Sequence, residues 1–291
     1  MKNKKSEFAC IVSLCIFIVL SLTEILVKFI WKSAVPSWMP WVYCVLELII
    51  LLVPGIILCK AQKLAPKRFF NLRPFRLSWL PVTVFGAVTA TLGAVLLNLL
   101  LYSLPFSSVF KSSPSIGTDA DKVALFLLTV LIPAIFEELY IHGAVMSMLR
   151  KRSIRSAVLI TALIFAMLHS SGANFLGPFF AAVIYGYLTV CYASVWPAVI
   201  AHFINNLLAD FMNLFVQRYV NIGINGYIIV FVLLLFLVSL WFFCTLLQKQ
   251  VKKIRVSTAP HSETEVGFPI SLGIFVLCWA AKLTFSLLGL I

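Results

Sequence analysis

The 291-residue chain is 62% hydrophobic and only 11% charged, and its mean hydropathy is +1.05. Soluble domains are about half apolar and about a quarter charged, so this composition predicts a polytopic membrane protein and excludes a soluble enzyme, a disordered chain and a collagen-like fibre. The formal net charge of +13 is weak evidence for nucleic-acid binding, because the basic residues of membrane proteins gather in cytoplasmic loops.

The apolar residues form long unbroken runs, which predict transmembrane helices and not the alternating strands of a β-barrel. We expect helices over residues 8–31, 41–59, 78–104, 123–149, 155–170, 174–192, 196–216, 226–248 and 268–290. A helix needs about 20 residues to cross a bilayer, so the fifth and sixth runs are expected to be short, tilted or partly re-entrant. The predicted fold class is all-α, a polytopic transmembrane bundle of eight or nine helices, with nine preferred.

The basic residues give this bundle an orientation. Seventeen of the 23 Lys and Arg residues precede the first helix or follow the second, fourth and eighth, and all of these positions lie on one side of the membrane if the helices alternate. The positive-inside rule then predicts a cytoplasmic N-terminus and, with nine helices, an external C-terminus. The first run carries no typical cleavage site, so we expect it to be retained. With no organelle-targeting segment recognisable, we expect a bacterial cytoplasmic membrane.

Charged groups are costly in hydrocarbon, so those inside the apolar runs carry most of the functional information. Glu24 lies four residues before Lys28, and we interpret it as half of an ion pair on one helix face. Glu47 stands alone in the second run, where a hydrogen bond to a neighbouring helix or a place at the mouth of a cavity is the default interpretation. The other intramembrane acids and histidines are Glu137, Glu138, His142, His169, His202 and Asp210.

These six residues lie on the fourth, fifth and seventh runs and are expected to face one polar cavity in the core of the bundle. Adjacent residues of a helix point about 100° apart, so Glu137 and Glu138 should not both face one narrow site, and one of them would do chemistry while the other positions it. His142 stacks one turn beyond Glu138. His202, Asn206 and Asp210 are spaced four residues apart and form a polar stripe on an apolar helix.

Three motifs in these runs resemble those of a known family. The segment FEELYIHG (Phe136–Gly143) resembles a first motif of two glutamates, three intervening residues and an arginine. The second motif is resembled by Phe165 with His169, and the third by His202 with Asn206. The family is that of the CPBP intramembrane proteases (CAAX protease and bacteriocin-processing, or Abi), relatives of the Rce1-type CAAX prenyl endopeptidase. Each motif alone is weak, but three in order on successive apolar runs are fairly specific.

The resemblance implies an intramembrane endopeptidase whose substrate is a hydrophobic or lipidated (CAAX-like) peptide or a leader peptide. Glu137, helped by His169, would activate a water molecule, and His202 and Asn206 would stabilise the oxyanion. Glu138, His142 and Asp210 would support them. The implied arrangement is a protease core over 121–216, flanked by N-terminal helices over 1–120 and C-terminal helices over 217–291. His142 stands where the family has arginine, and a protonated histidine is the expected substitute.

Other functions stay open at this stage. We prefer a reaction without a cofactor, yet Glu137, His169 and His202 could hold zinc with a water as its fourth ligand. No H-E-x-x-H motif supports that alternative. A transporter also uses intramembrane Glu, His and Asp, but no internal repeat is visible. A non-proteolytic scaffold or immunity protein is the remaining alternative. The expected partners are membrane lipids and the peptide substrate, and not nucleic acid.

Overall fold

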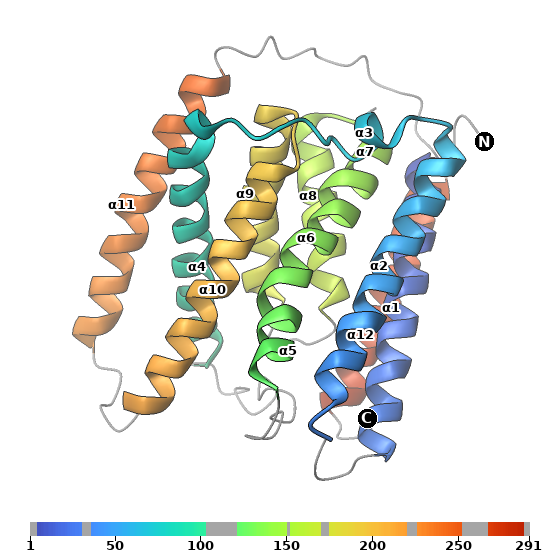
Figure 1. Ribbon diagram of the computed structural model, residues 1–291, viewed down its shortest axis with the longest axis horizontal. Coiled ribbons are helices and arrows are strands. Elements are labelled where there is room, and N and C mark those ends of the chain that lie inside the picture. Colours follow the sequence, from blue (N-terminus) through green and yellow to red (C-terminus); the bar gives the residue numbers. More distant parts are fainter. Residues whose placement is uncertain are drawn as a thin grey trace.

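The computed structural model describes residues 5–30, 36–102, 121–149, 152–169, 175–219, 226–251 and 267–287, and within them it is helical with no strand. Figure 1 shows the long helices side by side, running alternately in opposite directions. Eight of them are α1 (Lys5–Ile30), α2 (Met39–Gln62), α4 (Leu80–Tyr102), α8 (Ile154–Leu168), α9 (Leu176–Tyr192), α10 (Trp196–Tyr219), α11 (Gly226–Val251) and α12 (Gly267–Leu287).

The ninth long helical segment is a continuous rod over 122–148. It is built from α5 (Lys122–Phe126), α6 (Ile132–Glu138) and α7 (Met146–Met148), joined by two π-helical segments at Leu127–Leu131 and Leu139–Val145. Each predicted apolar run is therefore helical, so the described part of the chain confirms the all-α bundle. Backbone groups in lipid have no water to bind, and a helix satisfies them internally.

Six of these segments are long and apolar enough to cross a membrane: α1, α2, α4 with the turn before it, the rod, α11 and α12. The fifth and sixth predicted runs are short, as expected, because α8 has 15 residues and α9 has 17. The segment that joins α2 to α4 contains the one-turn helices α3 (Pro66–Phe69) and Leu77–Trp79 and lies across one end of the bundle (Figure 1).

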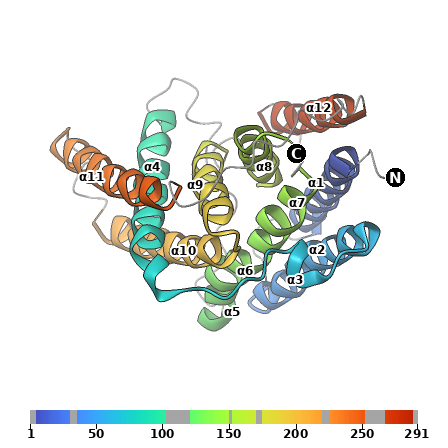
Figure 2. The same cartoon turned by 90° about the horizontal axis from the view of Figure 1, so that it is seen from above.

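Seen from above, the bundle has a centre and two flanks (Figure 2). The rod packs against α10, and α9 packs against α8, α4 and α10, so these helices form the centre. On one flank α11 covers α4, and on the other α12 packs on α1, which lies beside α2. Every residue predicted for the site thus lies on a helix that has neighbours on several sides.

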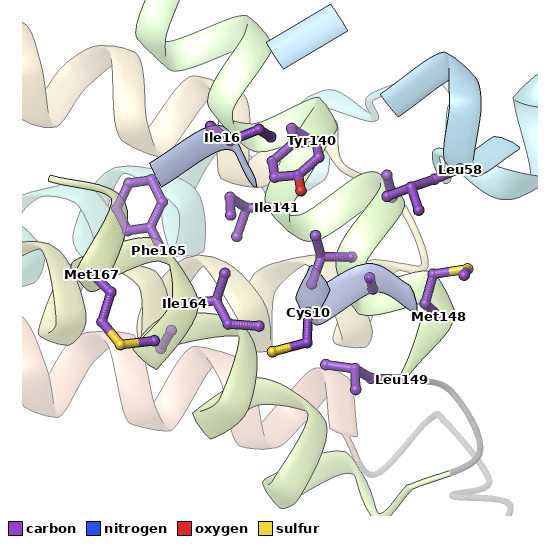
Figure 3. Close-up of a cluster of buried hydrophobic side chains, with 14 of the residues drawn as sticks. Cys10, Ile16, Leu58, Tyr140, Ile141, Met148, Leu149, Ile164, Phe165 and Met167 are labelled. Atoms are coloured by element: carbon purple, nitrogen blue, oxygen red, sulfur yellow. The ribbon is translucent and has the colours of Figure 1, made fainter. Parts of the chain in front are cut away.

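The largest apolar cluster joins α1, α2 and α12 to the centre of the bundle (Figure 3). Cys10 and Ile16 of α1 meet Tyr140 and Ile141 of the rod and Phe165 of α8 in this cluster. The Tyr140 hydroxyl has a polar partner there, since it lies 2.8 Å from Ser13 Oγ. This packing holds the rod and α8 against α1.

The rod departs from α-helical geometry on both sides of the two glutamates. Pro133 follows the first π-helical segment, and a proline has no N–H to donate and clashes with the carbonyl four residues before it, which explains the wider turn. The second π-helical segment begins directly after Glu138 and includes His142. Such segments are frequent at functional sites because they re-aim side chains.

Glu24 has a partner on another helix. Its carboxylate lies 2.7 Å from Lys282 Nζ, so it joins α1 to α12. The predicted pairing of Glu24 with Lys28 stays a prediction, because the side chain of Lys28 lies outside the described residues. An ion pair between distant helices cannot be recognised from spacing along one helix, so sequence analysis did not find the contact with Lys282.

Gly93 of α4 lies in close contact with α9. A Cβ atom at this position would stand 2.2 Å from Cε1 of Phe180 on α9. The variant Gly93→Ala must therefore push the Phe180 ring aside, and overpacking of this kind costs about 1–3 kcal/mol. We expect a lower thermal unfolding midpoint in detergent micelles. Gly273→Ala in α12 is the control, because nothing lies within 4 Å of its added methyl. Equal midpoints for the two variants would contradict the close packing of α4 on α9.

Candidate active site

The carboxylate of Glu138 is the centre of the polar cluster. It is fully buried, and its two oxygens have different partners. Oε2 lies 2.5 Å from Nδ1 of His142 on the same rod, and Oε1 lies 2.9 Å from Nδ1 of His202 on α10. A buried charge is tolerated only when it is paired and hydrogen-bonded, and Glu138 meets both conditions.

His142 extends this pair to a third helix. Its side chain is fully buried, and its Nε2 lies 3.1 Å from the carbonyl oxygen of Ala182 in α9. A carbonyl oxygen only accepts, so Nε2 carries a proton, and a further proton lies between Nδ1 and the Glu138 carboxylate. The Glu138 and His142 pair therefore has no net charge, whichever of the two holds that shared proton.

His202 lies between the two glutamates. Its Nδ1 donates to Glu138, and its Nε2 lies 3.8 Å from Oε2 of Glu137. Glu137 and Glu138 leave the rod in different directions, yet both approach the same imidazole. The imidazole presents a nitrogen on each of two edges, so one ring reaches carboxylates that leave the rod in different directions.

Aromatic rings hold the imidazole of His202 in place. Tyr185 of α9 stacks on it with ring centres 5.2 Å apart, and Phe165 of α8 approaches it edge-on at 5.9 Å. Phe165 also contacts the ring of His169, whose Nδ1 donates to the Phe165 carbonyl oxygen at 3.0 Å. This hydrogen bond places the proton of a neutral His169 on Nδ1 and leaves Nε2 as an acceptor.

A cavity of about 340 Å³ lies beside these rings, between α4, α8, α9 and α10. His169, His202 and Asn206 all line it, so the structure brings together three of the four residues predicted to be catalytic. The rest of the lining is mixed, with apolar side chains such as Val95 and Pro178. A lining of apolar side chains with a few polar groups is typical of ligand-binding pockets.

Glu137, the fourth predicted catalytic residue, lies next to His202 but not among the residues that line this cavity. Its side chain is 21% exposed, whereas its Oε2 is buried and accepts no hydrogen bond from a described residue. Glu47 of α2 lies near enough for the two carboxylates to interact electrostatically. Glu137 is thus the carboxylate of the cluster with an oxygen that can still accept a hydrogen bond.

Asp210 is placed apart from the other candidates. Its Oδ2 accepts a hydrogen bond of 2.8 Å from Thr129 Oγ1, in the first π-helical segment of the rod. It does not line the cavity, although it continues the stripe of His202 and Asn206 along α10. The spacing of four residues gave the correct helix face, but it carries no information on how far the cavity extends along that face.

Sequence reasoning missed four polar residues of the cavity, namely Thr91, Asn98, Tyr185 and Asn205. Asn205 was set aside because it lies off the stripe, yet it lines the cavity and its Oδ1 accepts a 2.8 Å hydrogen bond from Thr91 of α4. Its Nδ2 lies 3.5 Å from Oδ1 of Asn206. Tyr185 also lines the cavity, and its buried hydroxyl has no hydrogen-bond partner among the described residues. The doubled asparagine was the one signal in the sequence that could have indicated Asn205.

The three residues considered as zinc ligands are not gathered around one point. Across the described part of the chain, no three His, Cys, Asp or Glu side chains are grouped closely enough to hold a metal ion. Glu137 and His202 approach each other, and the ring of Phe165 contacts the rings of both His202 and His169.

Comparison with known proteins adds one finding to this geometry. Residues 119–208 match the family described as Rce1-like, type II CAAX prenyl endopeptidase. This segment is 90 of the 291 residues and is similar to the Rce1-like family. No curated protein and no solved structure matches the chain. The match confirms the resemblance inferred from the three motifs, and the long apolar helices are those of an integral membrane protein.

The Rce1-like segment contains each residue of the cluster around Glu138 and ends two residues before Asp210. It also contains the departure from the family pattern at His142. Arginine would bring a permanent charge and several donors to this position. Histidine supplies two donors, one toward Glu138 and one toward the Ala182 carbonyl oxygen.

The variant His142→Ala tests this role of the buried pair. It leaves Glu138 with one partner in place of two, and breaking a buried ion pair costs about 3–5 kcal/mol. We expect a markedly lower unfolding midpoint in micelles and a lower yield of folded protein. His169→Ala is the comparison, because this partly exposed side chain makes one hydrogen bond, to its own helix, and its loss should lower the midpoint much less. A midpoint for His142→Ala equal to that of His169→Ala would contradict the pairing.

Proposed function

We propose that this protein is an intramembrane endopeptidase that hydrolyses a peptide bond with Glu137 as the general base. The observation that carries the proposal is the position of His202, with one nitrogen on Glu138, the other toward Glu137, and one side on the cavity. The family match supports a CAAX-type endopeptidase, and the residue roles below are our own inference.

Charge balance supports the starting state. With Glu137 and Glu138 ionised, protonated His142 and His202 make the cluster neutral, which avoids a net charge in the low-dielectric interior. Protonated His202 donates from Nδ1 to Glu138, 2.9 Å away, and its Nε2–H remains for a ligand in the cavity. In this state Glu137 is the unprotonated group with an oxygen that no described donor occupies.

In the first step Glu137 takes a proton from a water molecule as the water oxygen attacks the scissile carbonyl carbon. His169 assists by accepting a hydrogen bond from the same water through Nε2, since its Nδ1 is held by the Phe165 carbonyl. The carbonyl π electrons move to oxygen and form the oxyanion of a tetrahedral intermediate. The charge lost at Glu137 equals the charge gained at the oxyanion, so the cluster stays neutral overall.

His202 and Asn206 stabilise that oxyanion by donating hydrogen bonds into the cavity that both residues line. Donors that are already oriented are worth several kcal/mol in such a site, because they need no reorganisation when the charge forms. The stacking of Tyr185 on His202 and the Glu138 hydrogen bond supply this orientation. Glu138 and His142 are therefore positioning residues, which act through His202.

In the second step the protonated Glu137 returns its proton to the leaving amide nitrogen as the C–N bond breaks. The products are a carboxylic acid and an amine, which become a carboxylate and an ammonium once the acid gives its proton to the amine, and Glu137 is again ionised. No metal or other cofactor is needed for this sequence, since a carboxylate and a neutral imidazole hold the water.

The substrate class follows from the surroundings of the site. The cavity lies within the bundle between α4, α8, α9 and α10, and its walls are partly apolar. We propose a hydrophobic or lipidated peptide, such as a CAAX-like tail or a leader peptide. We further propose that the end of the bundle that carries α3 and its basic neighbours faces the cytoplasm of a bacterial cell, since that end holds the positive charge of the sequence.

The isosteric variant Glu137→Gln tests the general base. It removes the proton acceptor and keeps the size of the side chain, so we expect cleavage to fall by at least about 10³-fold with an unchanged unfolding midpoint. Comparative peptidomics of membranes that contain the wild type or this variant would reveal the substrate as a peptide that accumulates uncleaved. Purified protein with that peptide would give the rates.

Asp210→Asn is the matched control, because it also replaces an intramembrane carboxylate by an amide but lies at Thr129 and not in the cavity. We expect its rate to stay within about threefold of wild type, as for a change outside the reacting groups. If Glu137→Gln and His169→Ala both insert correctly and keep full biological function, the protein is no protease, and a scaffold, immunity or transport function would take its place.

A zinc-dependent form of the same hydrolysis is supported by one contact, the 3.8 Å approach of Glu137 Oε2 to His202 Nε2, which a shared metal ion could bridge. Exhaustive chelation separates the two mechanisms. We expect the purified protein to keep its cleavage rate within about twofold after chelation, because no step above uses a metal. Loss of activity that zinc restores would establish the metal-dependent form.

A further inference from the structure

A second cavity, of about 380 Å³, lies at the end of the bundle that carries α3. It opens between the segment after α2, the start of α8 and the last turn of α9, and its Thr189 lies one turn after Tyr185 of the candidate active site. None of the predicted site residues lines it, and the proposed protease reaction makes no use of it.

Positive charge dominates this cavity. Lys67, Arg68, Arg73 and Arg152 all line it, and no Asp or Glu is among its described lining residues. Arg152 is held in place by Phe268, since its Cζ atom lies 4.0 Å from the centre of that ring. Helix α8 also begins here, with Ile154 in the lining, so the positive end of its dipole adds to the same field.

Two polar atoms at the cavity lack partners. The hydroxyl of Thr189 is buried and hydrogen-bonds to no described residue, and Thr189 is only 1% exposed. The Nε atom of Arg152 is likewise buried without an acceptor. Most threonines inside a helix donate to a carbonyl four residues before them, as Thr161 does here to Ala157. The unused Thr189 hydroxyl therefore points to a ligand that accepts hydrogen bonds.

Specific contacts fix the segment after α2 on the bundle, so this wall of the cavity has a defined position. Asn71 has a φ of 54° and accepts a hydrogen bond from Val195 N at its carbonyl oxygen, and the Arg73 carbonyl oxygen accepts one from Ser194 Oγ. The backbone of Phe70 lies so close to Gly143 that an added Cβ would stand 3.4 Å from Phe70 Cα. The basic side chains thus start from a backbone that is anchored to the rod and to the turn between α9 and α10.

We propose that this cavity is a binding site for a phosphate group, carried by the headgroup of an anionic phospholipid or by free phosphate. A phosphate offers several acceptor oxygens and a negative charge, which match the guanidinium groups, the ammonium group and the Thr189 hydroxyl. The cavity lies at the end of the bundle, at the level where headgroups meet helix ends. Basic pockets between transmembrane helices are typical sites for anionic headgroups.

The test uses the full-length protein in a neutral detergent and native mass spectrometry with two lipid probes, phosphatidylglycerol and phosphatidylcholine. We expect phosphatidylglycerol to bind at least about fivefold more tightly than phosphatidylcholine, and the pair Lys67→Gln with Arg73→Gln to remove most of that preference. Both side chains are exposed, so the exchange should not disturb folding. Similar binding of the two lipids by the wild type, with no binding of inorganic phosphate, would overturn the proposal.

The matched control is the pair Lys60→Gln with Lys249→Gln. These exposed residues lie near the same end of the bundle and remove the same charge, but they do not line the cavity. We expect this control pair to keep lipid affinity within about twofold of wild type. Equal losses for the two pairs would mean that diffuse surface charge attracts the lipid, and the cavity would not be a site.

The variant Thr189→Val separates a specific hydrogen bond from general attraction. It replaces a hydroxyl without a partner by a methyl of the same size, so folding should be unaffected, while phosphate affinity should fall about threefold or more. Inorganic phosphate as a competitor identifies the source of the group. Displacement of the lipid at millimolar phosphate would support a free-phosphate site, and resistance to it would support a lipid site. If Thr189→Val binds both probes as tightly as the wild type does, the proposed binding site is wrong.

Discussion

One buried carboxylate organises the centre of this protein. Glu138 has no access to solvent, so its charge must be compensated by groups that the fold itself supplies. Those groups come from its own rod and from α10, and through His142 the cluster reaches the backbone of α9. The orientation of His202, the separation of Glu137 from Glu138, and the position of the cavity wall all depend on this arrangement.

His142, which stands where the family has arginine, meets the same need of the buried Glu138 for a hydrogen-bonded partner. An arginine would fix a positive charge beside Glu138 at every pH, whereas the histidine shares a proton with the carboxylate over 2.5 Å. Its second nitrogen still reaches the Ala182 carbonyl oxygen, so the link between the rod and α9 is kept. The histidine therefore keeps one contact with Glu138 and one with the backbone of α9.

Sequence patterns predicted the helices and most of the site, because hydrophobic runs and spacing on one helix are local properties. The nine runs, the short α8 and α9, and the shared face of His202 and Asn206 all follow from them. Contacts between helices were out of reach. The pairing of Glu24 with Lys282, the hydrogen bond of Thr91 to Asn205, and the contact of both glutamates with one imidazole depend on packing between residues distant in the chain.

The length of α8 has a consequence for the membrane around the protein. Its 15 residues span about 22 Å, against a hydrocarbon core of about 30 Å, and its outward-facing Leu159 is 49% exposed. Hydrophobic mismatch of this size is relieved by local thinning of the bilayer. Because His169 follows the last residue of α8, thinning brings the aqueous boundary toward the candidate active site. A substrate held in the lipid by its apolar part would thus meet water and the histidine at the same depth.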